Sequence, residues 1–191
     1  VDHLVTRPEV DASRIVLMGA SMGGYLAPRA ATAEPRLALV VANPGVVSWH
    51  EAILATLGSY LPDFASVLAQ GEEAFDAYVT GLFAYSPFLE WGFTDMAWHH
   101  GVTTPSAFMR ELEGYTFEGR EAQVRAKVLV VDAEDEGPRG QARRLYDALD
   151  PERRSLIVFT REEAAQFHVQ PGATQVLTHK VFDWLDTELK H

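Results

Sequence analysis

The sequence contains no cysteine among its 191 residues. This absence excludes disulfide bonds, a thiol nucleophile and every metal site that needs a cysteine ligand. It suits a reducing compartment, so we expect a cytoplasmic protein. The sequence also lacks any apolar run that approaches the roughly 20 residues a helix needs to cross a bilayer, so we expect no membrane partner.

Basic residues are scarce, because 16 Lys and Arg stand against 27 Asp and Glu and leave a formal net charge of −11. A surface this acidic repels phosphate backbones, so we expect no nucleic-acid partner. Hydrophobic residues make up 47% and charged residues 23% of the chain, which is typical of a globular domain rather than a disordered one.

Four short apolar runs have the length and composition of strands that are buried on both faces. They lie at 13–19, 37–42, 127–132 and 155–159. Helical patterns follow the first, third and fourth runs, the last of them forming a C-terminal helix. Strand and helix in alternation predict crossover units, and therefore an α/β protein with a parallel sheet.

The stretch 46–120 differs from the rest, because its apolar residues recur at helical spacing and Thr104-Pro105 is typical of a helix start. A helical stretch inserted between two strands predicts a cap over the sheet. We therefore expect three segments: 1–45 and 121–191 as the two parts of the core, and 46–120 as an inserted helical cap.

A glycine-rich segment, Gly19-Ala20-Ser21-Met22-Gly23, joins the first run to the helix that follows. It fits Gly-x-Ser-x-Gly, a nucleophile elbow whose sharp turn strains the serine backbone and exposes its hydroxyl. We expect side chains in place of the flanking glycines to collide with the neighbouring strand and helix. The Met22 amide then becomes an oxyanion donor at the helix N-terminus. A phosphate loop is disfavoured, since its lysine-containing pattern is absent.

A serine nucleophile needs a histidine base that a carboxylate orients, and elbow hydrolases carry them in the order serine, acid, histidine. His168 follows the fourth run, in the loop before the last helix. The third run ends in an acidic cluster, where counting along the strand favours Glu136 over Asp135 as the acid and leaves both open. Asp132 ranks behind them, because it should still lie within the strand.

Metal chemistry is disfavoured. The adjacent His99 and His100 face apart on a helix, and no carboxylate–histidine spacing accompanies them. We expect neither a metal nor another cofactor.

Several blocks resemble one family. They are Thr6-Arg-Pro-Glu-Val-Asp11, the elbow through Arg29, Asn43-Pro-Gly45, and the segments 140–149, 159–163, 168 and 182–186. With them the sequence resembles the α/β-hydrolase superfamily. More narrowly it resembles the capped serine hydrolases that include 2,6-dihydroxypseudooxynicotine hydrolase and the fungal polyketide-shortening hydrolases.

The resemblance implies that Ser21 is the nucleophile, His168 the base and Glu136 the acid, acting on a small-molecule substrate. Members of this group cleave carbon–carbon bonds next to ketones, and their relatives cleave esters or peptides. Where relatives carry aspartate this chain has Glu136, which leaves the acid assignment open beside Asp135. The alternatives are a carboxylesterase or peptidase-like hydrolase and, in another class, a non-catalytic hydrolase-like binding protein.

Only four sheet strands are found, whereas in this fold several strands precede the one that carries the nucleophile. We therefore expect the chain to be the C-terminal portion of a larger hydrolase. The missing N-terminal half of the same protein would be its partner and supply the second oxyanion donor, so we expect this segment alone to be poorly active. A homodimer stays open.

Overall fold

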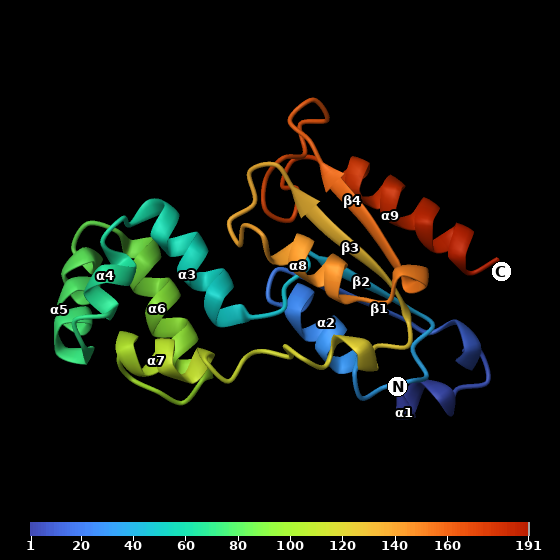
Figure 1. The fold of residues 1–191 in the computed structure, drawn as a ribbon, viewed down its shortest axis with the longest axis horizontal. Coiled ribbons are helices and arrows are strands. Elements are labelled where there is room, and N and C mark those ends of the chain that lie inside the picture. The colour runs from blue at the N-terminus through green and yellow to red at the C-terminus, as the bar shows by residue number, and fades with distance from the viewer. Residues whose placement is uncertain (191) are drawn as a thin grey trace. The chain divides into compact units, whose positions relative to one another are not determined.

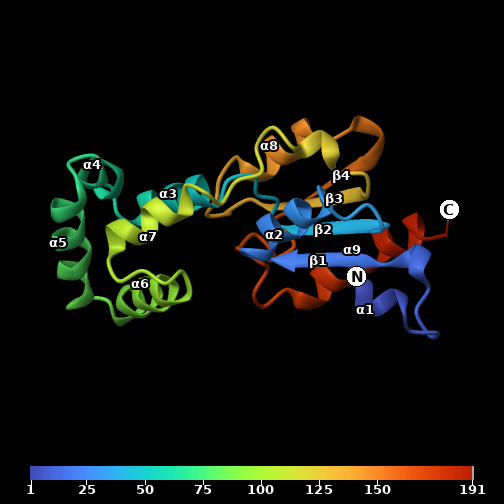
Figure 2. The same ribbon diagram turned by 90° about the horizontal axis from the view of Figure 1, so that it is seen from below.

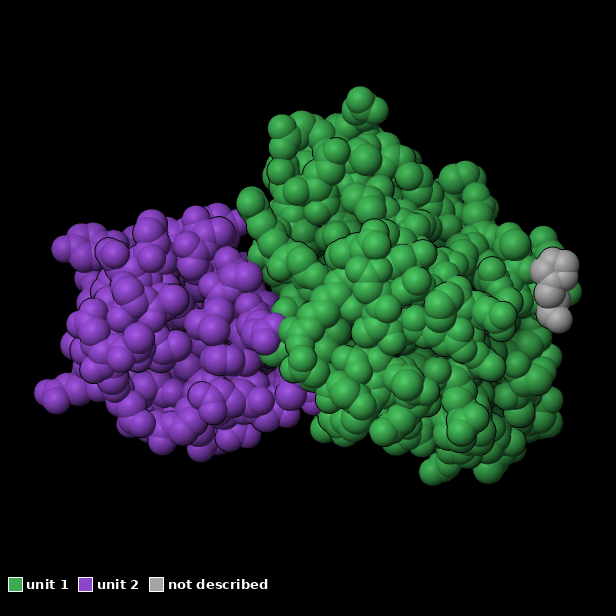
Figure 3. Space-filling view, in the orientation of Figure 1, with its two compact units in different colours: residues 1–48, 117–191 green, residues 49–116 purple. Residues whose placement is uncertain are grey.

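The computed structural model describes residues 1–190, and the chain divides into two compact units (Figure 3). One unit is formed by residues 1–48 together with the chain from residue 117 onward, and the other by residues 49–116. These boundaries lie a few residues inside the expected cap of 46–120. No helix in the described part of the chain is both long and apolar enough to cross a membrane.

The first unit is built on a parallel sheet with strand order β1-β2-β3-β4 (Figure 1). The strands are β1 (Val16–Ala20), β2 (Leu39–Asn43), β3 (Lys127–Ala133) and β4 (Arg154–Phe159). Each overlaps an apolar run of the sequence, which confirms the predicted parallel sheet. Because every neighbouring pair is parallel, all four strands end at the same edge.

Helices cover both faces of this sheet. They are α2 (Gly23–Ala31), α8 (Gln141–Ala148) and α9 (Thr174–Glu188), with the short α1 (Asp2–Val5) and the single turns η1 (Ala12–Arg14), η2 (Glu121–Gln123) and η3 (Pro151–Arg153). Val41 and Leu129 point into the core that α9 closes with Val181, whereas the neighbouring Val130 faces α8. Figure 2 shows α8 and α9 on opposite sides of the sheet. The strands therefore alternate between two apolar layers.

Burial differs between the central and the outer strands. Every residue of β2 is buried, as is most of β3, as the apolar runs predict. The same prediction is wrong for β1 and β4, where Met18 and Val158 are each 43% exposed. Within the described residues these two strands are the edges of the sheet, so each pairs on one side only.

The second unit consists of five helices: α3 (Trp49–Tyr60), α4 (Phe64–Leu68), α5 (Glu72–Phe83), α6 (Pro87–His99) and α7 (Pro105–Leu112). The predicted helix start is confirmed, because the Thr104 hydroxyl accepts from the N–H of Ala107 at 3.2 Å and caps α7. Aromatic side chains fill its core, with edge-to-face contacts between Phe64 and Phe75 and between Phe93 and Phe108. The helical spacing of apolar residues in 49–116 therefore arises because these helices pack around an apolar core of their own.

Candidate active site

The turn between β1 and α2 has the geometry of a nucleophile elbow. Ser21 has φ 56°, in the left-handed region that costs a residue with a Cβ about 1–2 kcal/mol. Main-chain hydrogen bonds hold it there. The Ser21 N–H donates to the Asn43 carbonyl at 2.7 Å, and the Gly24 N–H donates to the Ser21 carbonyl at 2.8 Å. The strain is therefore balanced by contacts from the neighbouring strand and from the first turn of α2.

Two glycines allow the chain to fold back this tightly, and they are not the pair that the motif suggests. A Cβ on Gly19 would lie 2.0 Å from the carbonyl oxygen of Gly23, and one on Gly24 would lie 1.9 Å from that of Pro44. The expected collision at Gly23 is wrong, because nothing lies within 4 Å of a Cβ there. Gly24 lies outside the five-residue motif. The only indication of its role in the sequence is that a second glycine follows Gly23.

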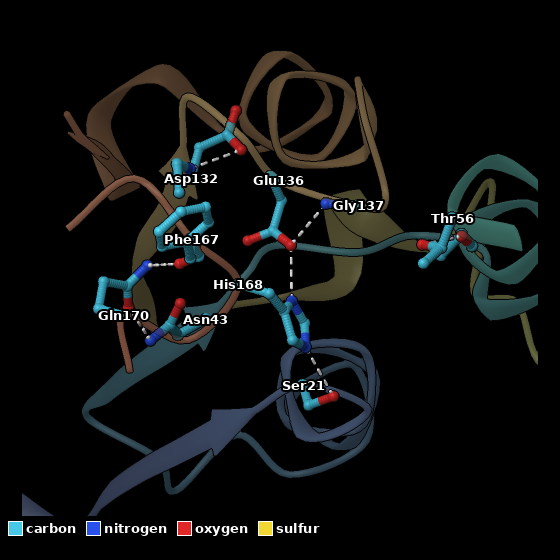
Figure 4. Close-up of polar contacts among 11 residues, drawn as sticks. Ser21, Asn43, Thr56, Asp132, Glu136, Gly137, Phe167, His168 and Gln170 are labelled. Atoms are coloured by element: carbon cyan, nitrogen blue, oxygen red, sulfur yellow. Dashed lines mark hydrogen bonds and ion pairs between the residues drawn. The ribbon is translucent and has the colours of Figure 1, made fainter. Parts of the chain in front are cut away.

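Ser21, His168 and Glu136 form a continuous hydrogen-bonded series (Figure 4). His168 Nε2 lies 2.9 Å from Ser21 Oγ, and His168 Nδ1 lies 2.6 Å from Glu136 Oε1. A carboxylate accepts a hydrogen bond, so Nδ1 carries the proton and Nε2 is left to accept from the serine hydroxyl. This arrangement can deprotonate Ser21.

Of the two acids that the sequence leaves open, the structure brings Glu136 to the histidine. Its side chain is 2% exposed, and Oε1 also accepts from the Gly137 N–H at 3.0 Å. Asp135 turns away and forms an ion pair with Arg161, whose Nη2 lies 2.8 and 2.9 Å from its two oxygens. The Asp135 N–H donates to the Gln166 carbonyl at 2.9 Å. Asp135 therefore ties the acid loop to the loop that carries His168.

Asp132 lies in β3, as expected, and has no contact with His168 among the described hydrogen bonds. Its Oδ1 accepts from the Ala133 N–H at 2.9 Å. Burial raises the pKa of Asp132, and the nearby Glu136 carboxylate raises this pKa further. Asp132 therefore lies near Glu136 and interacts with it through charge, without a described hydrogen bond to His168.

Met22 stands at the N-cap of α2, and its N–H has no acceptor among the described residues. The partial positive charge of the helix end favours an anion at this N–H.

Three other histidines have described partners outside this series of hydrogen bonds. His99 and His100 bond to carbonyls of their own helix, His179 pairs with Asp183, and His191 lies outside the described residues. Within residues 1–190, no group of three or more histidine, aspartate or glutamate side chains could hold a metal ion.

The sequence is similar to known hydrolases. Residues 1–76 match the prolyl oligopeptidase family. The chain is 30% identical over 200 residues to hydrolase LUC6 of Fusarium sp. This alignment covers 97% of this chain and 47% of that protein. It is 25% identical over 193 residues to 20-hydroxy-prefusarin hydrolase FUS2 of Gibberella moniliformis, covering 97% and 46%. The chain thus spans a little under half the length of these curated relatives.

Solved structures are similar in fold. The 2,6-dihydroxy-pseudo-oxynicotine hydrolase superposes with a TM-score of 0.58 at 17% identity, covering 96% of this chain and 42% of that one. The α/β hydrolase GrgF from Penicillium sp. sh18 gives 0.59 at 14% identity, covering 100% and 70%. The chain has the α/β-hydrolase fold. The fold class predicted from the strand order and the elbow is therefore confirmed.

Replacing Gly24 with alanine should destabilise this α/β-hydrolase fold by about 1–3 kcal/mol, because the new Cβ has no room beside Pro44. Urea unfolding measures the change. Gly23→Ala is the matched control, since its Cβ meets open space. It should change the free energy of unfolding by less than about 0.5 kcal/mol. Equal losses in the two variants would show that the contact with Pro44 is unimportant.

Replacing Asp132 with asparagine should raise the melting temperature at neutral pH. The pKa of Asp132 is raised in the folded α/β-hydrolase unit, so its ionised form costs stability above the ordinary pKa of about 3.9. The cost disappears as the pH falls below that value, and the gap between variant and parent should narrow toward about pH 3. Asp186→Asn, at an exposed position of α9, is the control. A gap that does not change with pH would contradict the assignment.

Proposed function

We propose that the protein is a serine hydrolase in which Ser21 is the nucleophile, His168 the base and Glu136 the acid. The observation that carries this proposal is the series of two hydrogen bonds from Ser21 Oγ through His168 to Glu136. The three residues come from the loops after three different strands, so their meeting does not follow from any one local motif. The relatives named as hydrolases support the same class of activity.

The reaction begins when His168 Nε2 accepts the Ser21 proton as the serine oxygen attacks a substrate carbonyl. Glu136 keeps the other proton on Nδ1 and stabilises the imidazolium that forms. The Met22 N–H and a second amide bind the oxyanion. His168 then protonates the leaving group, and water releases the acyl product by the same route.

Glutamate fits this role because the turn after β3 holds it. Its side chain is one methylene longer than that of aspartate, so it needs a support that fixes where the carboxylate lies. The bond from the Gly137 N–H to Glu136 Oε1 supplies one, on the same oxygen that faces His168. The ion pair of Asp135 with Arg161 keeps the neighbouring carboxylate away from the imidazole.

As substrate we propose a ketone whose carbon–carbon bond is cleaved, as in a diketone or polyketide-like compound. The leaving group is then a carbanion, which needs an adjacent carbonyl or aromatic ring to delocalise its charge. The resemblance to capped serine hydrolases that cleave carbon–carbon bonds next to ketones supports this proposal, and the similarity to 20-hydroxy-prefusarin hydrolase supports hydrolysis more broadly. The match of residues 1–76 to the prolyl oligopeptidase family favours the second candidate, hydrolysis of small esters or amides.

A fluorophosphonate probe tests the nucleophile and the acid together. We expect it to label Ser21 and not the Ser21→Ala variant. Glu136→Gln should slow labelling by roughly 10²–10⁴-fold, because the histidine loses the partner that orients it. Asp135→Asn, the matched control, should change the rate by less than about threefold, since its carboxylate pairs with an exposed arginine.

Two outcomes would contradict the proposal. If the full-length protein stays unlabelled while a known serine hydrolase reacts, the protein is a hydrolase-like binding protein. If Glu136→Gln labels at the normal rate and Asp135→Asn does not, the acid is not Glu136.

Product analysis with two substrate panels separates the two substrate classes. With the full-length protein we expect turnover of aryl β-diketones with release of a carboxylic acid and a ketone, and loss of this turnover in Ser21→Ala. Simple aryl esters of similar size are the comparison panel. Hydrolysis of the esters with no cleavage of any diketone would favour the esterase and exclude the carbon–carbon hydrolase.

A further inference from the structure

Two buried amide side chains lie next to the proposed catalytic residues and take no part in the chemistry described above. Asn43 and Gln170 are both 0% exposed, and Asn43 Nδ2 donates to Gln170 Oε1 at 2.9 Å (Figure 4). Burying an amide is costly unless it is hydrogen-bonded. An amide pair that joins the end of β2 to a loop 127 residues away in the chain therefore needs an explanation.

Asn43 supports the serine. It is the last residue of β2 and pairs with Ala20 at the end of β1. Its carbonyl accepts the hydrogen bond from the Ser21 N–H at 2.7 Å. The main chain of Asn43 thus holds the strained residue of the elbow, while its side chain extends toward the loop that carries the histidine.

Gln170 supports the histidine. The Phe167 carbonyl accepts from the Gln170 N–H at 2.9 Å and from Gln170 Nε2 at 3.3 Å, which closes a turn around His168. Val169 and Gln170 have φ values of 53° and 52°, a region that residues with a Cβ disfavour. A turn with two such residues in succession does not keep its shape unless other contacts hold it.

The orientation of both amides follows from one carbonyl. The Phe167 oxygen can only accept, so Gln170 must present Nε2 to it and Oε1 to Asn43. Asn43 must then present Nδ2. An acid in place of Asn43 would set one acceptor against another. The residue types at 43 and 170 are therefore specified by the contact between the two loops.

We infer that Asn43 and Gln170 are positioning residues, which together set the distance between His168 Nε2 and Ser21 Oγ. This inference rests on the proposed function and adds to it. The bond between Ser21 and His168 alone joins an imidazole on a strained turn to a hydroxyl that rotates freely. The amide pair instead fastens the turn around His168 to the same residue that fastens the elbow.

The test is a double-mutant cycle with Asn43→Leu, Gln170→Met and the double variant, since these replacements keep the side-chain size close to the original. Two quantities are measured for each protein: the melting temperature, and the rate at which the fluorophosphonate labels Ser21 as a function of pH. Gln141→Met is the matched control. Gln141 is a buried amide at the start of α8 whose Oε1 accepts from the N–H groups of Val47 and Ser48.

We expect each single variant to lower both the melting temperature and the maximal labelling rate, the latter by about 10–100-fold. The pH of half-maximal labelling should shift as well, because a displaced His168 also changes its contact with Glu136. The double variant should regain part of the melting temperature, because an apolar pair leaves no amide unsatisfied, and should not regain the rate. Gln141→Met should lower the melting temperature and leave the labelling rate unchanged.

An unchanged labelling rate and pH profile in folded Gln170→Met would overturn the inference and leave the proposed function standing. So would a rate that recovers with stability in the double variant. No labelling of the unmodified protein would instead refute the proposed function. If Gln170→Met does not fold, Gln170→Asn replaces it, since it keeps the amide and shortens only its reach. We expect the same loss of rate, and normal labelling by that variant would overturn the inference.

Discussion

All four strands of the sheet run in one direction, and the rest of the molecule depends on this constraint. Parallel pairing brings the carboxyl ends of β1, β3 and β4 to one edge, so the loops that follow them meet there. Ser21 and His168, 147 positions apart in the chain, come within hydrogen-bonding distance for this reason. The strand β2, which lies between β1 and β3, ends at Asn43, whose carbonyl contacts the elbow and whose side chain contacts the histidine turn. The site therefore forms where several loops meet at the carboxyl edge of the sheet, and no single loop builds it.

Much of this arrangement could be predicted, because its signals are local. An apolar run followed by Gly-x-Ser-x-Gly and a helical pattern indicates a strand, a strained turn and a helix, each over a few residues. The position of His168 in the loop after the last strand followed from counting elements along the chain. Counting along the third strand favoured Glu136 over Asp135 but left both open, since the sequence does not show that Asp135 pairs with Arg161 in another loop. Long-range ion pairs leave no periodic trace in a sequence.

Two predictions were wrong, the full burial of β1 and β4 and the collision at Gly23, and both depend on contacts that are not local. The runs at β1 and β4 are as apolar as those at β2 and β3, because composition records a preference for the strand and not the number of its neighbours. Whether Met18 is buried depends on what lies beside β1, and in the described chain nothing pairs with that side. The collision at Gly24 likewise involves Pro44, from a segment that the motif does not include.

The left-handed residues after His168 have a consequence for motion. Glycine would occupy such a conformation without strain, but it would also let the turn open into many others. Valine branches at Cβ and disfavours this conformation, so the turn keeps its shape only because contacts such as the two bonds from Gln170 to the Phe167 carbonyl hold it. In the proposed reaction, these contacts would hold the imidazole in one place before the substrate binds. The reaction would then begin from a prearranged geometry, with little ordering left to be done.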